Sequence, residues 1–191
     1  MEHIFYSTIE KITDFLTKDT LCSEARRKQL IYGLQVFAYN VFVISVILIL
    51  AAICRCFLTS LLIFAVFGTF RILAGGYHCN SMAKCLLTTT AVIVGSGKCA
   101  QFIAFSLPVT ILLCIDLNAI FLSHTPRGTA KNPFSDSYSR LQKRRLRIAS
   151  ITLSCAAIFL PPIRSCILPA MLFAALFLSP VFRKKSSEPA D

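Results

Sequence analysis

Residues 41–50 read VFVISVILIL, a run in which only Ser45 is polar. The run lies inside a longer apolar segment, residues 30–54, and a helix of about 20 apolar residues crosses a bilayer core of about 30 Å. Backbone polar groups in hydrocarbon must be satisfied within their own segment, so such a stretch favours a membrane helix. Five similar segments follow, at 57–74, 82–97, 99–122, 148–163 and 165–182. The sequence therefore predicts an all-α polytopic membrane protein with six transmembrane helices.

The composition of the whole chain points to the same class. Of its 191 residues, 55% are hydrophobic and only 15% are charged, and the mean hydropathy is +0.69. Such a chain is too apolar for a disordered protein and unusual for a globular one. The composition excludes a water-soluble enzyme.

The distribution of charge predicts the orientation in the membrane. Twenty Lys and Arg against nine Asp and Glu give a net charge of +11, which in a soluble protein would suggest nucleic-acid binding. With the N-terminus in the cytoplasm, however, 17 of the basic residues fall on that side, and only Arg55, Lys98 and Arg164 fall on the other. The positive-inside rule then predicts both termini in the cytoplasm and no nucleic-acid partner.

The predicted membrane domain, residues 30–182, is flanked by two different segments. Residues 1–29 are expected to form an amphipathic helix, because apolar residues recur at helical spacing while charges occupy another face. These apolar residues are Phe5, Ile9, Ile12 and Leu16. The helix could lie in the membrane interface, pack on the protein's own loops or dock a substrate helix. Residues 183–191 are predicted to be a disordered cytoplasmic tail.

Glycine and proline interrupt the middle segments. Arg71 is followed by Ala74-Gly75-Gly76, and the third segment runs into Gly95-Ser96-Gly97. Glycine-broken helices at membrane depth are tolerated where they line a cavity, so we expect a partly polar pocket at the cytoplasmic ends of helices two and three. Pro108 is expected to kink the fourth helix.

The nine cysteines include no CxxC pair and no spacing typical of a metal site. The sequence therefore predicts no metal and no cofactor, and the missing CxxC argues against a thiol oxidoreductase. Most of these thiols are expected to be small buried apolar groups. No GxSxG or HExxH motif points to another kind of protease.

The stretch that carries chemistry is residues 71–85, RILAGGYHCNSMAKC. A cysteine protease needs a thiolate and an imidazole within hydrogen-bond reach, and His78 with Cys85 supplies both groups. Residues seven apart on a continuous helix are separated by about 10.5 Å along its axis, which is too far. We therefore expect Gly75-Gly76 to let His78 leave the helix and fold back, with the next helix beginning near Asn80 or Ser81.

These residues by themselves leave alternatives open. A His and a Cys seven apart can occur by chance among nine cysteines, and Cys79 is a rival nucleophile. Arg71 could be only a topology charge or could face lipid phosphates. A non-enzymatic transporter or assembly factor, with the Gly-Gly break lining a path, is the alternative function.

Arg71, Gly75-Gly76, Tyr77-His78, Ser81 and Cys85 together resemble the signature of the AgrB family, membrane endopeptidases of Gram-positive bacteria that process quorum-sensing propeptides. The six hydrophobic segments and the basic loop after the fourth also resemble that family. The resemblance implies that His78 and Cys85 are the catalytic pair. It implies that Arg71 and Gly76 are required for activity, with Gly75 and Ser81 as supporting residues. Cys79 stands where the family keeps no cysteine.

The resemblance also implies the substrate and partners. The substrate would be an AgrD-like propeptide with an amphipathic leader and an acidic tail, cut through an acyl-thioester and closed into a thiolactone or lactone. The protein would be a homodimer in the cell membrane, with its active site on the cytoplasmic side. A basic cluster could bind the acidic tail or anchor the protein on anionic membrane lipids. Its members are Arg140, Lys143, Arg144, Arg145 and Arg147.

Overall fold

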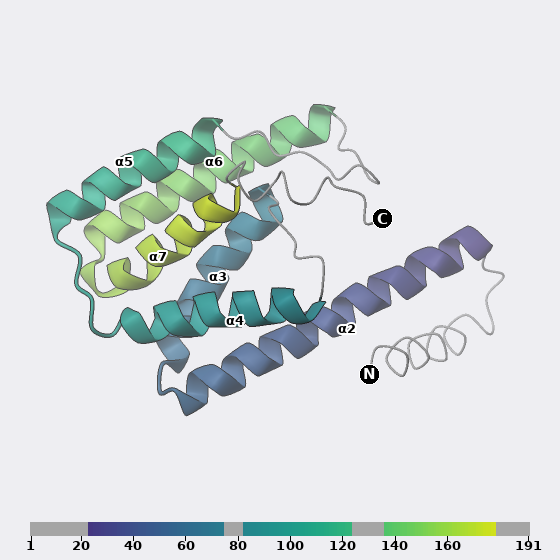
Figure 1. The fold of residues 1–191 in the computed structure, drawn as a ribbon. Coiled ribbons are helices and arrows are strands. Elements are labelled where there is room, and N and C mark those ends of the chain that lie inside the picture. Colours follow the sequence, from purple (N-terminus) through teal and green to yellow (C-terminus); the bar gives the residue numbers. More distant parts are fainter. Residues whose placement is uncertain (1–22, 75–81, 124–135, 179–191) are drawn as a thin grey trace, which may run out of the picture. The chain divides into compact units, whose positions relative to one another are not determined.

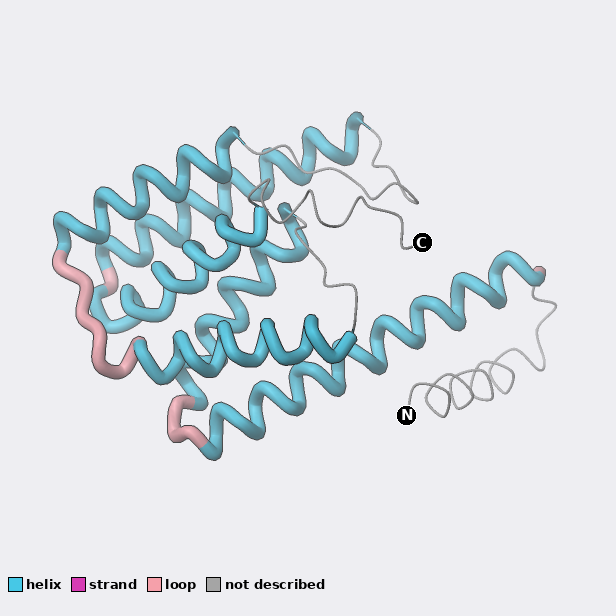
Figure 2. The backbone as a smooth tube through the Cα atoms, in the orientation of Figure 1, coloured by secondary structure: helices cyan, strands magenta, loops and turns pink. Residues whose placement is uncertain are grey.

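A computed structural model describes residues 23–74, 82–123 and 136–178, and every regular element in these ranges is a helix (Figures 1 and 2). The helices are α2 (Glu24–Ile53), α3 (Phe57–Ala74), α4 (Met82–Cys99), α5 (Leu107–Ser123), α6 (Asp136–Phe159) and α7 (Pro161–Leu178). The predicted all-α class is confirmed. Most of the predicted N-terminal amphipathic segment, 1–29, and all of the tail, 183–191, lie outside the described residues, so the predicted domain boundaries stay predictions.

Three of the described helices are long and apolar enough to cross a membrane, namely residues 26–53 of α2, all of α3 and all of α7. α5 is equally apolar but has 17 residues. α4 carries Thr88-Thr89-Thr90, and α6 carries the basic cluster in its first half, which makes both less apolar. The described residues thus define a helical membrane protein with three candidate spans, whereas hydropathy predicted six.

The chain divides into two compact units, Met1–Val46 and Ile47–Asp191. Most of α2 belongs to the first unit and shows how its apolar run tolerates polar residues. Asn40 donates a hydrogen bond to the carbonyl of Val36 at 2.8 Å, and Ser45 donates one to that of Val41 at 2.9 Å. Because these side chains bond to their own helix, the polar groups are satisfied without a partner helix.

The second unit is a bundle. α5, α6 and α7 lie side by side, α3 packs against α6 and α7, and α4 packs against α3 and α7 (Figure 1). Phe70 of α3 stacks on Phe121 of α5 with ring centroids 4.3 Å apart, and both side chains are buried. Ile63, Leu168 and Met171 are also fully buried, so the apolar core lies around α3 and α7.

Prolines stand at the beginnings of two helices. Pro108 is the second residue of α5, so the predicted kink is wrong. Residues 100–106, expected to be helical, instead form turns and an extended link. Proline is tolerated in a first turn because the backbone N–H there has no helical partner. Pro161 and Pro162 likewise begin α7 directly after Leu160, the residue between the last two helices.

α3 and α4 approach closely where α4 ends. A Cβ atom on Gly97 would overlap the Ser60 side chain and come within 3.0 Å of the Ser60 backbone nitrogen. Thr59 Oγ1 donates a hydrogen bond of 2.8 Å to the carbonyl of Gly97, and Lys98 Nζ donates one of 3.2 Å to that of Cys54. Glycine is needed at position 97 because only a residue without a side chain permits this approach.

Arg164, in the first turn of α7, joins three segments at the same end of the bundle. Its Nε donates to the carbonyl of Ala157 at 2.8 Å, Nη2 to that of Ile158 at 3.0 Å and Nη1 to that of Phe105 at 3.0 Å. Ala157 and Ile158 lie in the last turn of α6, whose carbonyls have no helical partner. We call this region, with the Gly97–Ser60 contact, the bonded end.

Candidate functional site

The predicted catalytic stretch lies at the opposite end of α4 from Gly97. Cys85 is the fourth residue of α4, and Arg71 lies in the last turn of α3. The structure describes only part of the predicted site. Outside the described residues lie Gly75, Gly76, His78, Cys79 and Ser81. The pairing of His78 with Cys85 and the polar pocket expected here therefore stay predictions.

Cys85 is a free thiol with a half-buried side chain. α4 begins at Met82, close to the predicted start near Asn80 or Ser81, and Cys85 lies about one turn in, as expected. The first turn of a helix presents backbone N–H groups without helical acceptors, which favours an anion nearby. A thiol at this position is reachable from outside the bundle and lies beside donors that can stabilise negative charge.

Arg71 is held between aromatic rings of two helices. Its guanidinium carbon lies 5.8 Å from the ring centroid of Phe67 on α3 and 5.7 Å from that of Phe177 on α7. The two rings meet edge to face, with centroids 5.9 Å apart. Contacts of this kind contribute roughly 0.5–2 kcal/mol each. The end of α3, from which residues 75–81 lead to Cys85, is thereby attached to α7.

The contacts of Arg71 with Phe67 and Phe177 were not predicted from the sequence. Phe67 and Arg71 are four residues apart, so they share a helix face, and that spacing was the available signal. Phe177 lies more than a hundred residues away, and no local pattern connects it to Arg71.

The basic cluster lies on a helix rather than in a loop. Residues 123–147 were expected to be one long polar loop, yet α6 begins at Asp136 and includes all five basic residues. Arg140, Arg144, Arg145 and Arg147 are exposed, whereas Lys143 is half-buried and the neighbouring Leu146 is fully buried. An amphipathic first half of α6 explains the difference, because its apolar face packs while its charges remain accessible.

The cysteines are less buried than expected. The seven in the described ranges are all free; Cys56, Cys114 and Cys166 are buried, and three others are exposed. The exposed thiols are Cys54, Cys99 and Cys155. The prediction that most would be buried is therefore wrong for this part of the chain. On a membrane helix a small apolar side chain can face lipid as well as protein.

A polar network between α5 and α6 was also missed. Asn118 Nδ2 donates to Ser154 Oγ at 2.6 Å, and Ser150 Oγ donates to Asn118 Oδ1 at 2.7 Å. Ser150 and Ser154 are four residues apart and so share one face of α6, which was the signal available in the sequence. Such side-chain bonds hold membrane helices together and set their register.

A helical membrane protein that presents a free cysteine in the first turn of one helix is the class these features define. The pattern of the AgrB family, Accessory gene regulator B, matches residues 9–180, and the chain belongs to this family.

A curated relative is Protein FsrB of Enterococcus faecalis, which is 27% identical over 154 residues. That match covers 78% of this chain and 63% of the relative, so less than two thirds of the relative's length is matched. No solved structure matches the chain. Membership in the AgrB family supports a role in quorum sensing.

Proposed function

We propose that this protein is a membrane-embedded cysteine endopeptidase and cyclase, which removes the C-terminal tail of an AgrD-like autoinducer propeptide. Cys85 is the nucleophile and His78 is its base. The observation that carries the proposal is the position of Cys85, a free and half-buried thiol in the first turn of α4, within a chain of the AgrB family.

Six spans with both termini in the cytoplasm belong to the same proposal. Three described helices already meet the length and hydropathy of a span, and the charge distribution favours cytoplasmic ends. In this topology the start of α4, and with it Cys85, faces the cytoplasm. A propeptide made in the cytosol can then reach the thiol without crossing the membrane.

The reaction proceeds in two steps. The Cys85 thiolate attacks the carbonyl carbon at the junction between the signal segment and the tail, and the amide nitrogen leaves with a proton from His78. Backbone N–H groups in the first turn of α4 can stabilise the oxyanion. The remaining acyl-thioester is attacked by a Cys or Ser of the substrate, which closes a thiolactone or lactone and releases Cys85.

Ring closure requires that the substrate's own nucleophile reacts before water does. Intramolecular attack in a well-oriented site can correspond to an effective concentration of about 10⁵ M or more. A site at the membrane boundary also excludes water, which would otherwise release a linear peptide. Arg71 acts as a positioning residue, because its contacts with Phe67 and Phe177 fix the end of α3 from which the chain leads to His78.

The exposed face of α6 is the proposed docking site for the acidic tail. Arg140, Arg144 and Arg147 follow one another at helical spacing, and all three are exposed. Charges of this kind raise the association rate and select the partner more than they raise affinity. The same face of α6 can also lie on anionic lipid. The proposed assembly is a homodimer.

Cleavage of an AgrD-like propeptide by full-length protein in membranes tests the proposal. Cys85→Ala should reduce the yield of released tail by at least about 10³-fold, because no other thiol replaces the nucleophile. Cys54→Ala is the matched control, since Cys54 is an exposed free thiol near the bonded end, and it should cleave at the parental rate. Normal cleavage by Cys85→Ala would show that Cys85 is not the nucleophile, and absence of cleavage by the parental protein would favour a non-enzymatic transport or assembly role instead.

A further inference from the structure

Arg164 carries a positive charge in a nearly enclosed place. Its side chain is only 9% exposed, and its three hydrogen bonds go to backbone carbonyls rather than to a carboxylate. In residues 47–74, 82–123 and 137–178 the only acid is Asp116, which is exposed on α5. Burying an uncompensated charge is costly. A guanidinium has five N–H groups, and these three bonds use three of them.

A cavity of about 310 Å³ lies beside this guanidinium. Arg164 and Ser165 at the start of α7 form one side of it, and Gln101 with the link between α4 and α5 forms another. Its polar lining and the charge of Arg164 suit an anionic oxygen group such as a phosphate.

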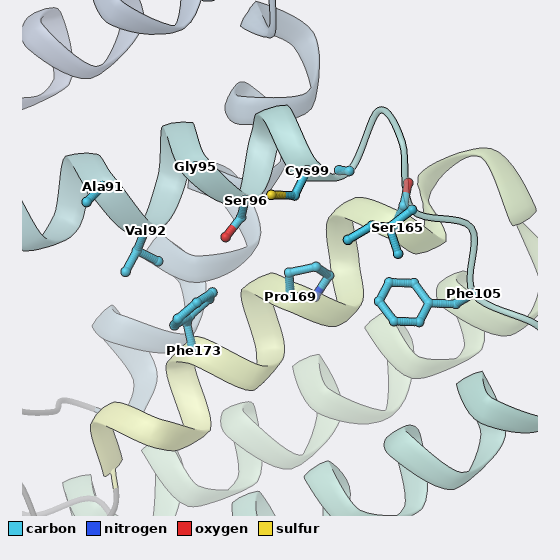
Figure 3. Close-up of a pocket in the computed structure, with 11 residues that line it drawn as sticks. Ala91, Val92, Gly95, Ser96, Cys99, Phe105, Ser165, Pro169 and Phe173 are labelled. Atoms are coloured by element: carbon cyan, nitrogen blue, oxygen red, sulfur yellow. The ribbon is translucent and has the colours of Figure 1, made fainter.

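A second, apolar cavity of about 470 Å³ runs between α4 and α7 (Figure 3). Ala91, Gly95 and Cys99 line it from α4, and Ser165, Pro169 and Phe173 line it from α7. On each helix the three residues are four apart, so each row extends about 12 Å along the helix axis. Ala91, Gly95 and Cys99 are exposed, so the cavity is a groove that opens on the outer surface of the bundle. We call it the α4–α7 groove.

The two cavities adjoin each other. Both are lined by Ala100, Ile103, Phe105 and Ser165. The combined site therefore has the Arg164 cation at the helix ends, and the apolar α4–α7 groove runs from there toward the middle of the helices.

We propose that this site binds one anionic phospholipid, with its phosphate beside Arg164 and an acyl chain in the α4–α7 groove. A soluble phosphate would leave the α4–α7 groove empty, and an apolar peptide helix would leave the buried charge of Arg164 without a counter-ion. A phospholipid fits both the cavity at Arg164 and the α4–α7 groove. In a membrane its head group lies at the helix ends and its acyl chains point toward the bilayer centre, which is the order in which the two cavities follow each other. The inference does not depend on the proposed peptidase activity.

The sequence contains no tryptophan, so Phe173→Trp places a single fluorescent reporter in the α4–α7 groove. The full chain is reconstituted in bilayers of zwitterionic phosphatidylcholine. Phosphatidylglycerol with brominated acyl chains, which quench nearby tryptophan, is then added at low mole fraction. We expect saturable quenching at mole fractions about tenfold lower than for brominated phosphatidylcholine.

Gly95 and Gly68 provide a matched pair of variants. At both positions an added Cβ meets nothing within 4 Å, so a side chain can begin there without a clash. Only Gly95 lines the α4–α7 groove. In the Phe173→Trp protein, Gly95→Leu should abolish the preference for phosphatidylglycerol, and Gly68→Leu should retain it.

Three outcomes would overturn the proposal. Equal quenching by the two brominated lipids would show that Arg164 selects no head group. Full competition by glycerol phosphate would show that a soluble anion occupies the site without a chain. Absence of quenching by either lipid, reversed when the protein is diluted in the bilayer, would show that a second copy covers the groove.

Discussion

The two ends of α4 are held in different ways. At the bonded end, Gly97 packs against the backbone of Ser60, and hydrogen bonds join the end of α4 to the first turn of α3 and to the turn before it. At the other end, Cys85 is half-buried, and Arg71, in the last turn of the preceding helix α3, is held by two aromatic rings. The bonded end therefore carries stability, and the Cys85 end remains accessible for chemistry. Substitutions at the two ends should accordingly separate stability from activity.

The largest stability effect is expected at Arg164. Arg164→Gln leaves carbonyls at the end of α6 and at Phe105 without their donor, and buried unsatisfied groups are costly. We expect the free energy of unfolding to fall by about 2–4 kcal/mol. Chemical unfolding of the protein in detergent micelles measures this. An unchanged free energy of unfolding would show that the buried guanidinium does not stabilise the fold.

Gly97→Ala should be the next most damaging change. The added Cβ meets Ser60 backbone atoms that cannot rotate away, so α3 and α4 must separate, at a cost of about 1–3 kcal/mol. Gly95→Ala is two residues away and meets no atom within 4 Å. Because alanine is the better helix former, Gly95→Ala should be neutral or stabilising by up to about 1 kcal/mol. The same unfolding experiment compares the two variants, and equal losses would contradict the close approach.

At the Cys85 end, we expect substitutions to lower the cleavage rate rather than the free energy of unfolding. Phe177→Leu removes one of the two rings beside Arg71, a contact of roughly 0.5–1 kcal/mol. Cleavage should slow by about two- to fivefold through kcat, while the unfolding midpoint stays close to the parent. Phe159→Leu, at an exposed phenylalanine that ends α6, is the control and should leave cleavage unchanged. Loss of stability without loss of rate would make Arg71 only a packing residue.

The smallest effect is expected on the exposed face of α6. Replacing Arg144 and Arg147 with Gln should raise KM for an acidic-tailed substrate by about two- to fivefold with kcat retained, as for exposed charge pairs. The effect should shrink as salt is raised, because exposed charges are screened. Lys98→Gln, on α4 at the bonded end, is the comparison and should not change the salt dependence of KM. An unchanged KM for the α6 variant would assign that face to lipid alone.

Local patterns predicted much of this fold. The apolar segments located all six described helices, α3 within its predicted bounds, and the start of α4 one turn before Cys85. Pro108 and residues 100–106 were misread because apolar content does not distinguish an apolar link from a helix. The helical start at Asp136 was missed because its basic side chains resemble those of a solvated loop.

Long-range contacts could not be predicted in the same way. Arg164 was taken as an orientation charge, yet it bonds to the carbonyl of Phe105, 59 residues away, as well as to that of Ala157 at the end of the preceding helix. Phe177 meets Arg71 across more than a hundred residues. Only three-dimensional packing brings such residues together. In contrast, Cys85 was singled out as the candidate nucleophile by the resemblance of residues 71–85 to the signature of the AgrB family, since their spacing alone left Cys79 as a rival.

The most direct measurement is the intact mass of the protein after co-expression with an AgrD-like propeptide whose internal Cys or Ser is replaced by Ala. Without that nucleophile the acyl-enzyme cannot cyclise and should accumulate. We expect an added mass equal to the acyl fragment, removable by hydroxylamine, present in Cys79→Ala and absent from Cys85→Ala. An adduct that persists in Cys85→Ala or disappears in Cys79→Ala would contradict the assignment of Cys85 as the nucleophile.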